Sequence, residues 1–218
     1  MSKNLFPMNK KNLKQTWKNL WHFIWEDNSI WSWIINIILA FILIKFIVYP
    51  GLGLALGTSY PIVAVVSNSM EHNYNFDTWW QNSEEYYSSI GIVKSSFEEF
   101  PLKNGFNKGD IMILWRANSD NLKIGDIIVF QGARTNPKPD PIIHRVIIIE
   151  ENDGTITYQT KGDNYLTNSR QINGCFQDGC IYESDIKQNQ VLGKAVFKVP
   201  YLGYIKIWFV DLLNFFIK

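Results

Sequence analysis

Two serines and one histidine are the residues of this 218-residue chain that best fit chemistry at neutral pH. Ser67 and Ser69 flank Asn68 at the end of an apolar run, and His144 lies inside another apolar run. A serine hydroxyl is a weak nucleophile until a base removes its proton, and an imidazole with a pKa of about 6.5 suits that task. Sequence spacing does not show contact, and Ser-Asn-Ser is by itself a turn signal, so a structural role for these residues is the alternative.

Six short runs rich in Val, Ile and aromatic residues predict the strands that would position these side chains. They are Pro61 to Ser67, Ile111 to Arg116, Asp126 to Gln131, Ile142 to Glu150, Thr155 to Lys161 and Val191 to Lys198. Asp153 and Gly154 separate two of the runs with residues that tolerate positive φ, which predicts a hairpin turn. We therefore expect a mainly β domain over residues 51–200.

Two segments interrupt this pattern of strands. Residues 71–108 carry no strand pattern, and their aromatic residues predict a helical insertion that is either a lid or binding loop or a surface excursion. Residues 165–185 form a long connection that contains the two cysteines of the chain, Cys175 and Cys180. In an extracytoplasmic domain such a pair favours a small disulfide loop over structural zinc, which needs four sulfur or imidazole ligands.

A transmembrane helix is predicted over residues 29–50. Between Ile30 and Tyr49, the residues that are not apolar are Ser32, Asn36 and Lys45, and 20 residues of helix span a hydrocarbon core of roughly 30 Å. The alternative is a cleaved signal peptide, which is disfavoured because its apolar stretch is shorter and no Ala-x-Ala site follows. Lys45 lies near the end of the span, where its long side chain reaches the interface.

The charges on either side of this span predict its orientation. The preceding segment, residues 1–28, contains five lysines (Lys3, Lys10, Lys11, Lys14 and Lys18), whereas residues 50–70 contain no Lys or Arg. By the positive-inside rule the N-terminus is cytosolic and the rest extracytoplasmic, which predicts a single-pass protein of the cell membrane. Trp17, Trp21 and Trp25 would line one face of a helix on the lipid surface, or of an ordinary partner-binding or core helix. Residues 201–218 predict a helix that docks on the membrane or on the domain.

The overall composition fits a folded domain beside a membrane. Apolar residues make up 46% of the chain and charged residues 19%, a balance that can bury a core. Lys plus Arg number 21 against 20 for Asp plus Glu, so the formal charge of +1 argues against a nucleic-acid partner. Nine Trp residues and 15% aromatic residues fit a membrane interface, where such rings accumulate.

Six sequence blocks occur together in an order that resembles signal peptidase I of the archaeal and endoplasmic-reticulum type. They are VVSNSM (65–70), GDI (109–111), KIGDIIVF (123–130), IIHRV (142–146), TKGDN (160–164) and VLGKAVFKVPYLGYI (191–205). In that type the basic residue before Arg-Val is His rather than Lys, as at His144. The resemblance covers residues 60–205 apart from the two interruptions, and it implies a signal-peptidase-like β catalytic domain.

The resemblance also implies roles for individual residues. Ser69 matches the nucleophile, its backbone N–H and the Ser67 hydroxyl match oxyanion donors, and His144 matches the general base. Asp163 matches one of two aspartates that the family uses near this histidine.

The second of these aspartates is missing. It lies six residues after the first in relatives, where this chain has Ser169. Either Asp163 orients His144 alone, which we favour, or Asp178 between the cysteines takes the vacant place. Lys161 is expected to be solvated or paired, and Arg145 to point away from the strand face that carries His144.

The implied activity is that of a membrane-bound serine endopeptidase that removes signal peptides from exported preproteins after small residues. It needs no cofactor and no metal, and its partners would be preproteins, the lipid bilayer and the protein export machinery. Three alternatives stay open: a non-catalytic membrane-anchored homologue that binds exported proteins, a related protease whose insertion at 71–108 selects a narrower set of substrates, and a metal hydrolase. The last would use His72 and His144 with Asp163 or Glu71, but Glu71–His72 lacks the HExxH spacing.

Overall fold

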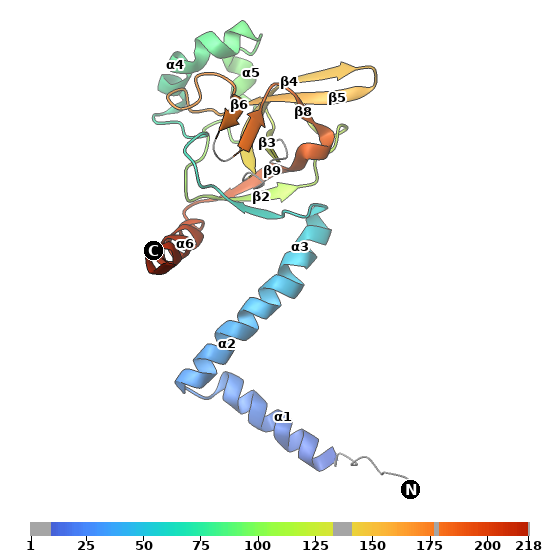
Figure 1. Cartoon of the computed structure of the whole chain (residues 1–218), viewed down its shortest axis with the longest axis vertical. Helices are drawn as coiled ribbons and strands as arrows, with labels where there is room; N and C mark the ends of the chain where they lie inside the picture. The colour runs from blue at the N-terminus through green and yellow to red at the C-terminus, as the bar shows by residue number, and fades with distance from the viewer. Residues whose placement is uncertain (1–9, 133–140, 177–178, 218) are drawn as a thin grey trace. The chain divides into compact units, whose positions relative to one another are not determined.

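The computed structural model of the chain describes residues 10–132, 141–176 and 179–217 (Figure 1). It divides into two compact units, residues 1–52 and 53–218. The first unit begins with helix α1 (Lys10–Trp25) and continues with α2 (Ile30–Leu43) and the π-helical turn η1 (Ile44–Val48). Helix α3 (Tyr49–Leu56) follows without a break and crosses the boundary between the two units.

The helical stretch Ile30–Leu56 is long and apolar enough to cross a membrane. Within the described residues, one helix meets these criteria. Its most apolar part is not buried against the rest of the protein, unlike the core helix of a soluble domain. The helix ends at Leu56, beyond the predicted end of the span at residue 50. The π-helical turn ends two residues before Pro50, whose missing N–H and bulky ring disturb regular helical hydrogen bonding.

Two polar residues of this apolar helix have partners at the end of α1. The Ser32 hydroxyl donates to the Phe23 carbonyl at 2.6 Å, and the Asn36 amide donates to the Ile24 carbonyl at 2.8 Å. The last carbonyls of a helix lack partners within it, so these side chains satisfy them. The polar residues of the apolar run therefore fix the bend between α1 and α2.

The second unit is built on a seven-stranded antiparallel sheet, which confirms the predicted mainly β fold. Its strands, in sheet order, are β1 (Ile62–Ala64), β2 (Ile111–Trp115), β9 (Val191–Val199), β3 (Ile127–Phe130), β4 (Ile142–Asn152), β5 (Thr155–Lys161) and β8 (Ile186–Lys187). Each of the six predicted runs overlaps a strand, and β4 and β9 extend one or two residues beyond their predicted ends. The β4–β5 hairpin turns at Asp153 and Gly154, whose φ angles are +50° and +74°, as predicted.

One buried cluster holds the start of the sheet together beneath the Ser67–Ser69 segment. It includes Val65, Met70, Phe106, Met112 and Ile127, and Met70 is fully buried. A side chain of that size removed from water stabilises the fold by about 2 kcal/mol. The residue after Ser69 thus anchors the serine segment to the core.

The predicted helical insertion contains α4 (Phe76–Ser89) and α5 (Lys94–Glu98), which lie side by side in Figure 1. Asn75 caps α4 by accepting a hydrogen bond from the Thr78 N–H. Trp79, Tyr87 and Phe97 are fully buried in a second cluster that also contains Ile147 of β4. The insertion is therefore packed on the sheet by large aromatic side chains.

The long connection at 165–185 contains a small two-stranded sheet of β6 (Asn173–Phe176) and β7 (Gly179–Tyr182). Cys175 and Cys180 face each other across these strands and form a disulfide, as the sequence favoured. The 3-10 turn η2 (Gln188–Gln190) then leads into β9. The chain ends with α6 (Tyr204–Ile217), whose 14 residues extend about 21 Å, less than the thickness of a bilayer core.

Candidate active site

Ser69 lies on a tight turn that follows edge strand β1. The turn is closed by a hydrogen bond from the Glu71 N–H to the Asn68 carbonyl at 3.1 Å. Ser67 is exposed and Ser69 half-buried, and their hydroxyl oxygens lie 3.1 Å apart in a hydrogen bond. The two serines that the sequence singled out therefore form one site at the surface.

The loop after β5 brings Ser69 to the neighbourhood of His144. The Asn164 N–H donates to the Ser69 carbonyl at 2.9 Å, and a methyl group added at Gly162 would lie 2.7 Å from the same oxygen. Arg145, the neighbour of His144, pairs with Lys161 across β4 and β5, and Lys161 directly precedes Gly162. The serine backbone is thus packed against the segment that leaves β5 beside the histidine strand.

His144 is bonded to a buried carboxylate, that of Glu183. Its Nδ1 is hydrogen-bonded to Glu183 Oε1, and both side chains are almost completely buried. With Nδ1 directed to the carboxylate, Nε2 is the ring nitrogen left to accept a proton. This is the arrangement in which a carboxylate holds the imidazole orientation and stabilises the imidazolium that forms.

Glu183 is itself fixed by further hydrogen bonds to its carboxylate and its backbone. Oε1 accepts from the Thr160 hydroxyl at 2.9 Å, and Oε2 accepts from the Ile172 N–H at 2.6 Å. The Glu183 backbone bonds both neighbours, since its N–H donates to the Ile172 carbonyl and its carbonyl accepts from the Thr160 N–H. A buried carboxylate needs such partners to offset the cost of leaving water. Glu183 is therefore held rigidly against His144.

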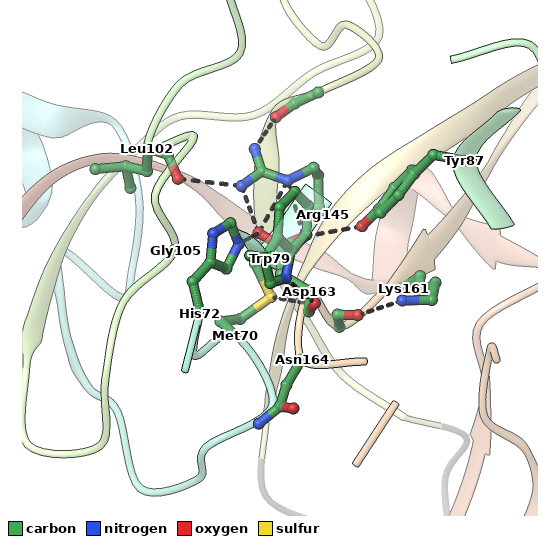
Figure 2. Close-up of polar contacts among 12 residues, drawn as sticks. Met70, His72, Trp79, Tyr87, Leu102, Gly105, Arg145, Lys161, Asp163 and Asn164 are labelled. Atoms are coloured by element: carbon green, nitrogen blue, oxygen red, sulfur yellow. Dashed lines mark hydrogen bonds and ion pairs between the residues drawn. The ribbon is translucent and has the colours of Figure 1, made fainter. Parts of the chain in front are cut away.

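Asp163 lies in a different network, centred on Arg145 (Figure 2). Arg145 is fully buried and reaches Asp163 through Nε at 3.0 Å and Nη2 at 2.6 Å. Its other N–H groups donate to the carbonyls of Pro101, Gly125 and Leu102. A buried ion pair is tolerated when its remaining hydrogen-bonding groups are satisfied, and here they are.

Asp163 also joins the segments that carry the serine, the histidine and the insertion. His72, three residues after Ser69, lies 3.3 Å from Asp163 Oδ2 and stacks on Trp79, with ring centroids 3.7 Å apart. Trp79 Nε1 donates to the Asp163 carbonyl at 2.8 Å, and the Tyr87 hydroxyl donates to Oδ1 at 3.2 Å (Figure 2). One carboxylate thus connects α4 to both sides of the site.

Electrostatics keep Asp163 charged. Burial alone would raise the pKa of Asp163, but the Arg145 guanidinium and the His72 hydrogen bond hold that pKa far below its usual range. Burial and the nearby Asp163 charge raise the pKa of Tyr87 well above 10. Tyr87 therefore stays protonated and donates to the carboxylate.

These positions change the expected role of the aspartates. Asp163 was expected to orient His144, but its carboxylate binds Arg145, and the carboxylate on His144 belongs to Glu183. Asp178, the other candidate, lies outside the described residues. Arg145 points away from His144 as predicted.

Glu183 is the residue that the sequence analysis missed. The only signal was the absence of an aspartate from the position of Ser169, which left the histidine without a second acidic partner. Residues 165–185 are a predicted long connection, but nothing in their spacing distinguishes Glu183 from Asp178. Lys161 was expected to be solvated or paired and is buried instead, with its Nζ bonded to the Gly162 carbonyl.

Among the described residues, no group of three His, Cys, Asp or Glu side chains is placed to hold a metal ion. The fold and the site together define a class of protein: an antiparallel β domain that follows an apolar helix and carries neighbouring serines and a buried histidine–carboxylate pair.

Comparison with known proteins shows which of them this chain is similar to. The chain is homologous to catalytic subunits of signal peptidase complexes, which confirms the resemblance to the endoplasmic-reticulum type. It is 29% identical over 165 residues to the subunit SEC11 of Lachancea thermotolerans, which covers 75% of this chain and 74% of that protein. It is 28% identical over 169 residues to SEC11C of Homo sapiens, covering 77% and 67%, respectively. No protein-family model matches the chain.

Proposed function

We propose that this protein is a membrane-bound serine endopeptidase that cleaves signal peptides from exported preproteins after small residues. The observation that carries the proposal is the buried His144–Glu183 pair beside the loop that holds Ser69. The homology to signal peptidase complex catalytic subunits supports the same activity. The word complex in the names of these relatives further suggests that other subunits act with this chain.

In the proposed mechanism, the Ser69 oxygen attacks the carbonyl carbon of the scissile peptide bond while its proton passes to His144 Nε2. Glu183 stabilises the imidazolium, and the Ser69 N–H and the Ser67 hydroxyl stabilise the oxyanion. The imidazolium then protonates the leaving amine, which leaves an acyl ester on Ser69. A water molecule, deprotonated by His144, hydrolyses this ester. No cofactor enters any of these steps.

Asp163 has a positioning role in this proposal. It binds the residue after His144 and the residue three positions after Ser69, so it fixes the two segments relative to each other. The aspartate predicted from the sequence would thus support catalysis through Arg145 and His72 and not through His144 itself.

The substrate would bind as an added strand. β1 is an edge of the sheet in the described part of the chain, and it runs directly into the Ser67–Ser69 turn. An extended peptide paired with this edge would be led to the nucleophile, with small residues accepted at the first and third positions before the cut. The Leu56 end of the apolar helix lies 13 residues before Ser69, which keeps the site near an extracytoplasmic membrane surface. The N-terminus would be cytosolic.

The test is cleavage of a preprotein with an Ala-x-Ala site by the detergent-solubilised chain. Wild type should cut, whereas Ser69→Ala and His144→Ala should lose nearly all activity while keeping the wild-type circular dichroism spectrum. Glu183→Gln should also lose most of its activity. Asp178→Ala is its control, because both acidic residues come from the same connection. Wild-type activity in Ser69→Ala would refute the mechanism. If the wild type and the variants all bind the preprotein but none cleaves it, even with partner subunits added, a non-catalytic homologue is favoured.

A further inference from the structure

A cavity of about 390 Å³ lies between α4 and the loop that follows β5. One wall comes from the insertion and includes Ser83, Glu85 and Tyr86, and the other includes Lys161 and Arg170. Neither the proposed mechanism nor the strand-edge binding of substrate uses this cavity. Its lining contains two buried polar groups whose hydrogen-bonding capacity is not filled.

The first of these groups is the Lys161 ammonium. The side chain is 2% exposed, and among the described residues its sole hydrogen-bond acceptor is the Gly162 carbonyl, at 2.8 Å. The ammonium otherwise faces the rings of Tyr86 and Tyr87, whose centroids lie 5.0 and 5.3 Å away. An ammonium carries three N–H donors, so it has donors left for an acceptor in the cavity. Burial lowers the pKa of Lys161 to about 8, against the attraction of Asp163 and Glu183, which leaves it mainly protonated at neutral pH.

The second group is the Ser83 hydroxyl. Ser83 is 4% exposed, and its oxygen is fully buried without a hydrogen-bond partner in the described part of the chain. A buried hydroxyl without a partner costs free energy, and native proteins rarely leave one so unless a ligand or water completes it. Ser89 in the same helix offers a contrast, because its hydroxyl donates to the Tyr86 carbonyl at 2.7 Å.

Two residues of the cavity lining are sequence neighbours of residues that contact Ser69. Lys161 precedes Gly162, which packs against the Ser69 carbonyl, and Tyr165 of the cavity wall follows Asn164, which bonds the same carbonyl. Part of the cavity lining and the residues that contact the Ser69 backbone therefore belong to the same short segment, residues 161–165. The charged side chains of the lining are Lys161, Arg170 and Glu85, a net formal charge of +1, which matches one carboxylate better than a dianion such as phosphate.

We propose that this cavity is a subsite that binds the side-chain carboxylate of an acidic residue in the polypeptide cut at Ser69. Lys161 and Ser83 donate to the carboxylate inside the cavity, and Arg170, which is exposed, attracts it at the mouth. The inference rests on the proposed function, and it makes the insertion a determinant of which substrates are preferred.

The test uses a set of preprotein peptides in which one Asp is moved across the positions on both sides of the cleavage site. Each peptide has an Asn counterpart of the same shape. At one position, wild type should cleave the Asp peptide with a kcat/KM about tenfold above that of the Asn peptide, as expected for one charge-assisted hydrogen bond. Ser83→Ala and Arg170→Gln should each reduce this ratio several-fold.

Matched controls separate the subsite from general effects. Ser89→Ala lies in the same helix and cavity, but its hydroxyl is already bonded, so it should keep the ratio. Arg116→Gln removes an exposed charge elsewhere and should also keep it. Ser83→Ala removes a hydroxyl without a partner, so a drop in its thermal stability would contradict the structural basis of the proposal.

Binding of the same peptides to Ser69→Ala protein, measured by calorimetry, separates failure of the subsite from failure of the proposed function. If the wild type cuts the Asn peptides but no position favours Asp, the subsite proposal is wrong and the peptidase proposal stands. If no peptide is cut, the binding data decide: tighter binding of an Asp peptide that is lost in Ser83→Ala supports the subsite, and equal binding of all peptides refutes it.

Discussion

His144 and Arg145 are adjacent in β4 but bind different carboxylates. His144 contacts Glu183, whereas Arg145 is paired with Asp163. Successive side chains of a strand point to opposite faces of a sheet, so two neighbours in sequence serve two separate networks. One network contains the proposed base, and the other connects the serine segment, β4 and the insertion.

This separation predicts opposite phenotypes for the two carboxylates. Glu183→Gln should lower kcat by roughly 100-fold or more, because a neutral amide neither stabilises the imidazolium nor fixes the same tautomer of His144. Single-turnover cleavage of a preprotein measures this loss, and Glu183→Asp, which keeps the charge, should recover part of it. Glu150→Gln, which changes an exposed acidic residue of β4, is the control and should keep the wild-type kcat. Wild-type kcat in Glu183→Gln would remove Glu183 from the mechanism.

Asp163→Asn should act mainly on stability. It leaves the fully buried Arg145 guanidinium without its counter-ion, which costs about 3–5 kcal/mol in the free energy of unfolding. Urea unfolding followed by tryptophan fluorescence measures the change, since Trp79 is bonded to Asp163. Asp77→Asn provides the comparison: it breaks an exposed ion pair with Lys94 and should have little effect. Equal stability of the two variants would contradict the buried network.

The buried Lys161 predicts a pH dependence of stability. Burial lowers its pKa from 10.5 to about 8, so between these values the unfolded chain binds more protons at this position than the folded chain. The free energy of unfolding therefore rises with pH. The destabilisation caused by burying the Lys161 ammonium is complete below pH 8 and vanishes toward pH 10.5. The free energy of unfolding of wild type, minus that of Lys161→Met, should increase by about 2 kcal/mol between about pH 7.5 and 10.

Urea titrations of both proteins at several pH values measure this difference. Tyr87 and the other titrating groups are common to the two proteins, so their contributions largely cancel in the subtraction. A difference that does not change with pH would mean that the ammonium is not buried as described.

The insertion should behave as part of the core. Phe97 is fully buried, contacts the rings of both Trp79 and Tyr87, and has the Arg145 guanidinium 4.8 Å from its ring centroid. Phe97→Ala should therefore lower the free energy of unfolding by about 3–5 kcal/mol. Val93→Ala changes an exposed residue at the start of α5 and should have a small effect. An insertion that is only a surface excursion would tolerate both substitutions equally.

Local patterns were sufficient for the elements that depend on neighbouring residues. Alternating and β-branched runs predicted the strands, Asp153 and Gly154 predicted the hairpin turn, and the apolar run after residue 29 predicted the long helix. The cysteine pair was also predictable, because only five positions separate its members and a short hairpin brings them together.

The sequence by itself determined the strands, the apolar helix and, through the resemblance, the candidate serine and histidine. Only the tertiary structure decided which carboxylate meets His144, because Glu183 lies 39 residues away and reaches it through the β6–β7 connection. The same holds for Lys161, whose burial depends on helix α4 packing over the end of β5. Strand and helix patterns arise from interactions between near neighbours, whereas contacts between distant segments depend on how long connections fold back, which no local spacing records.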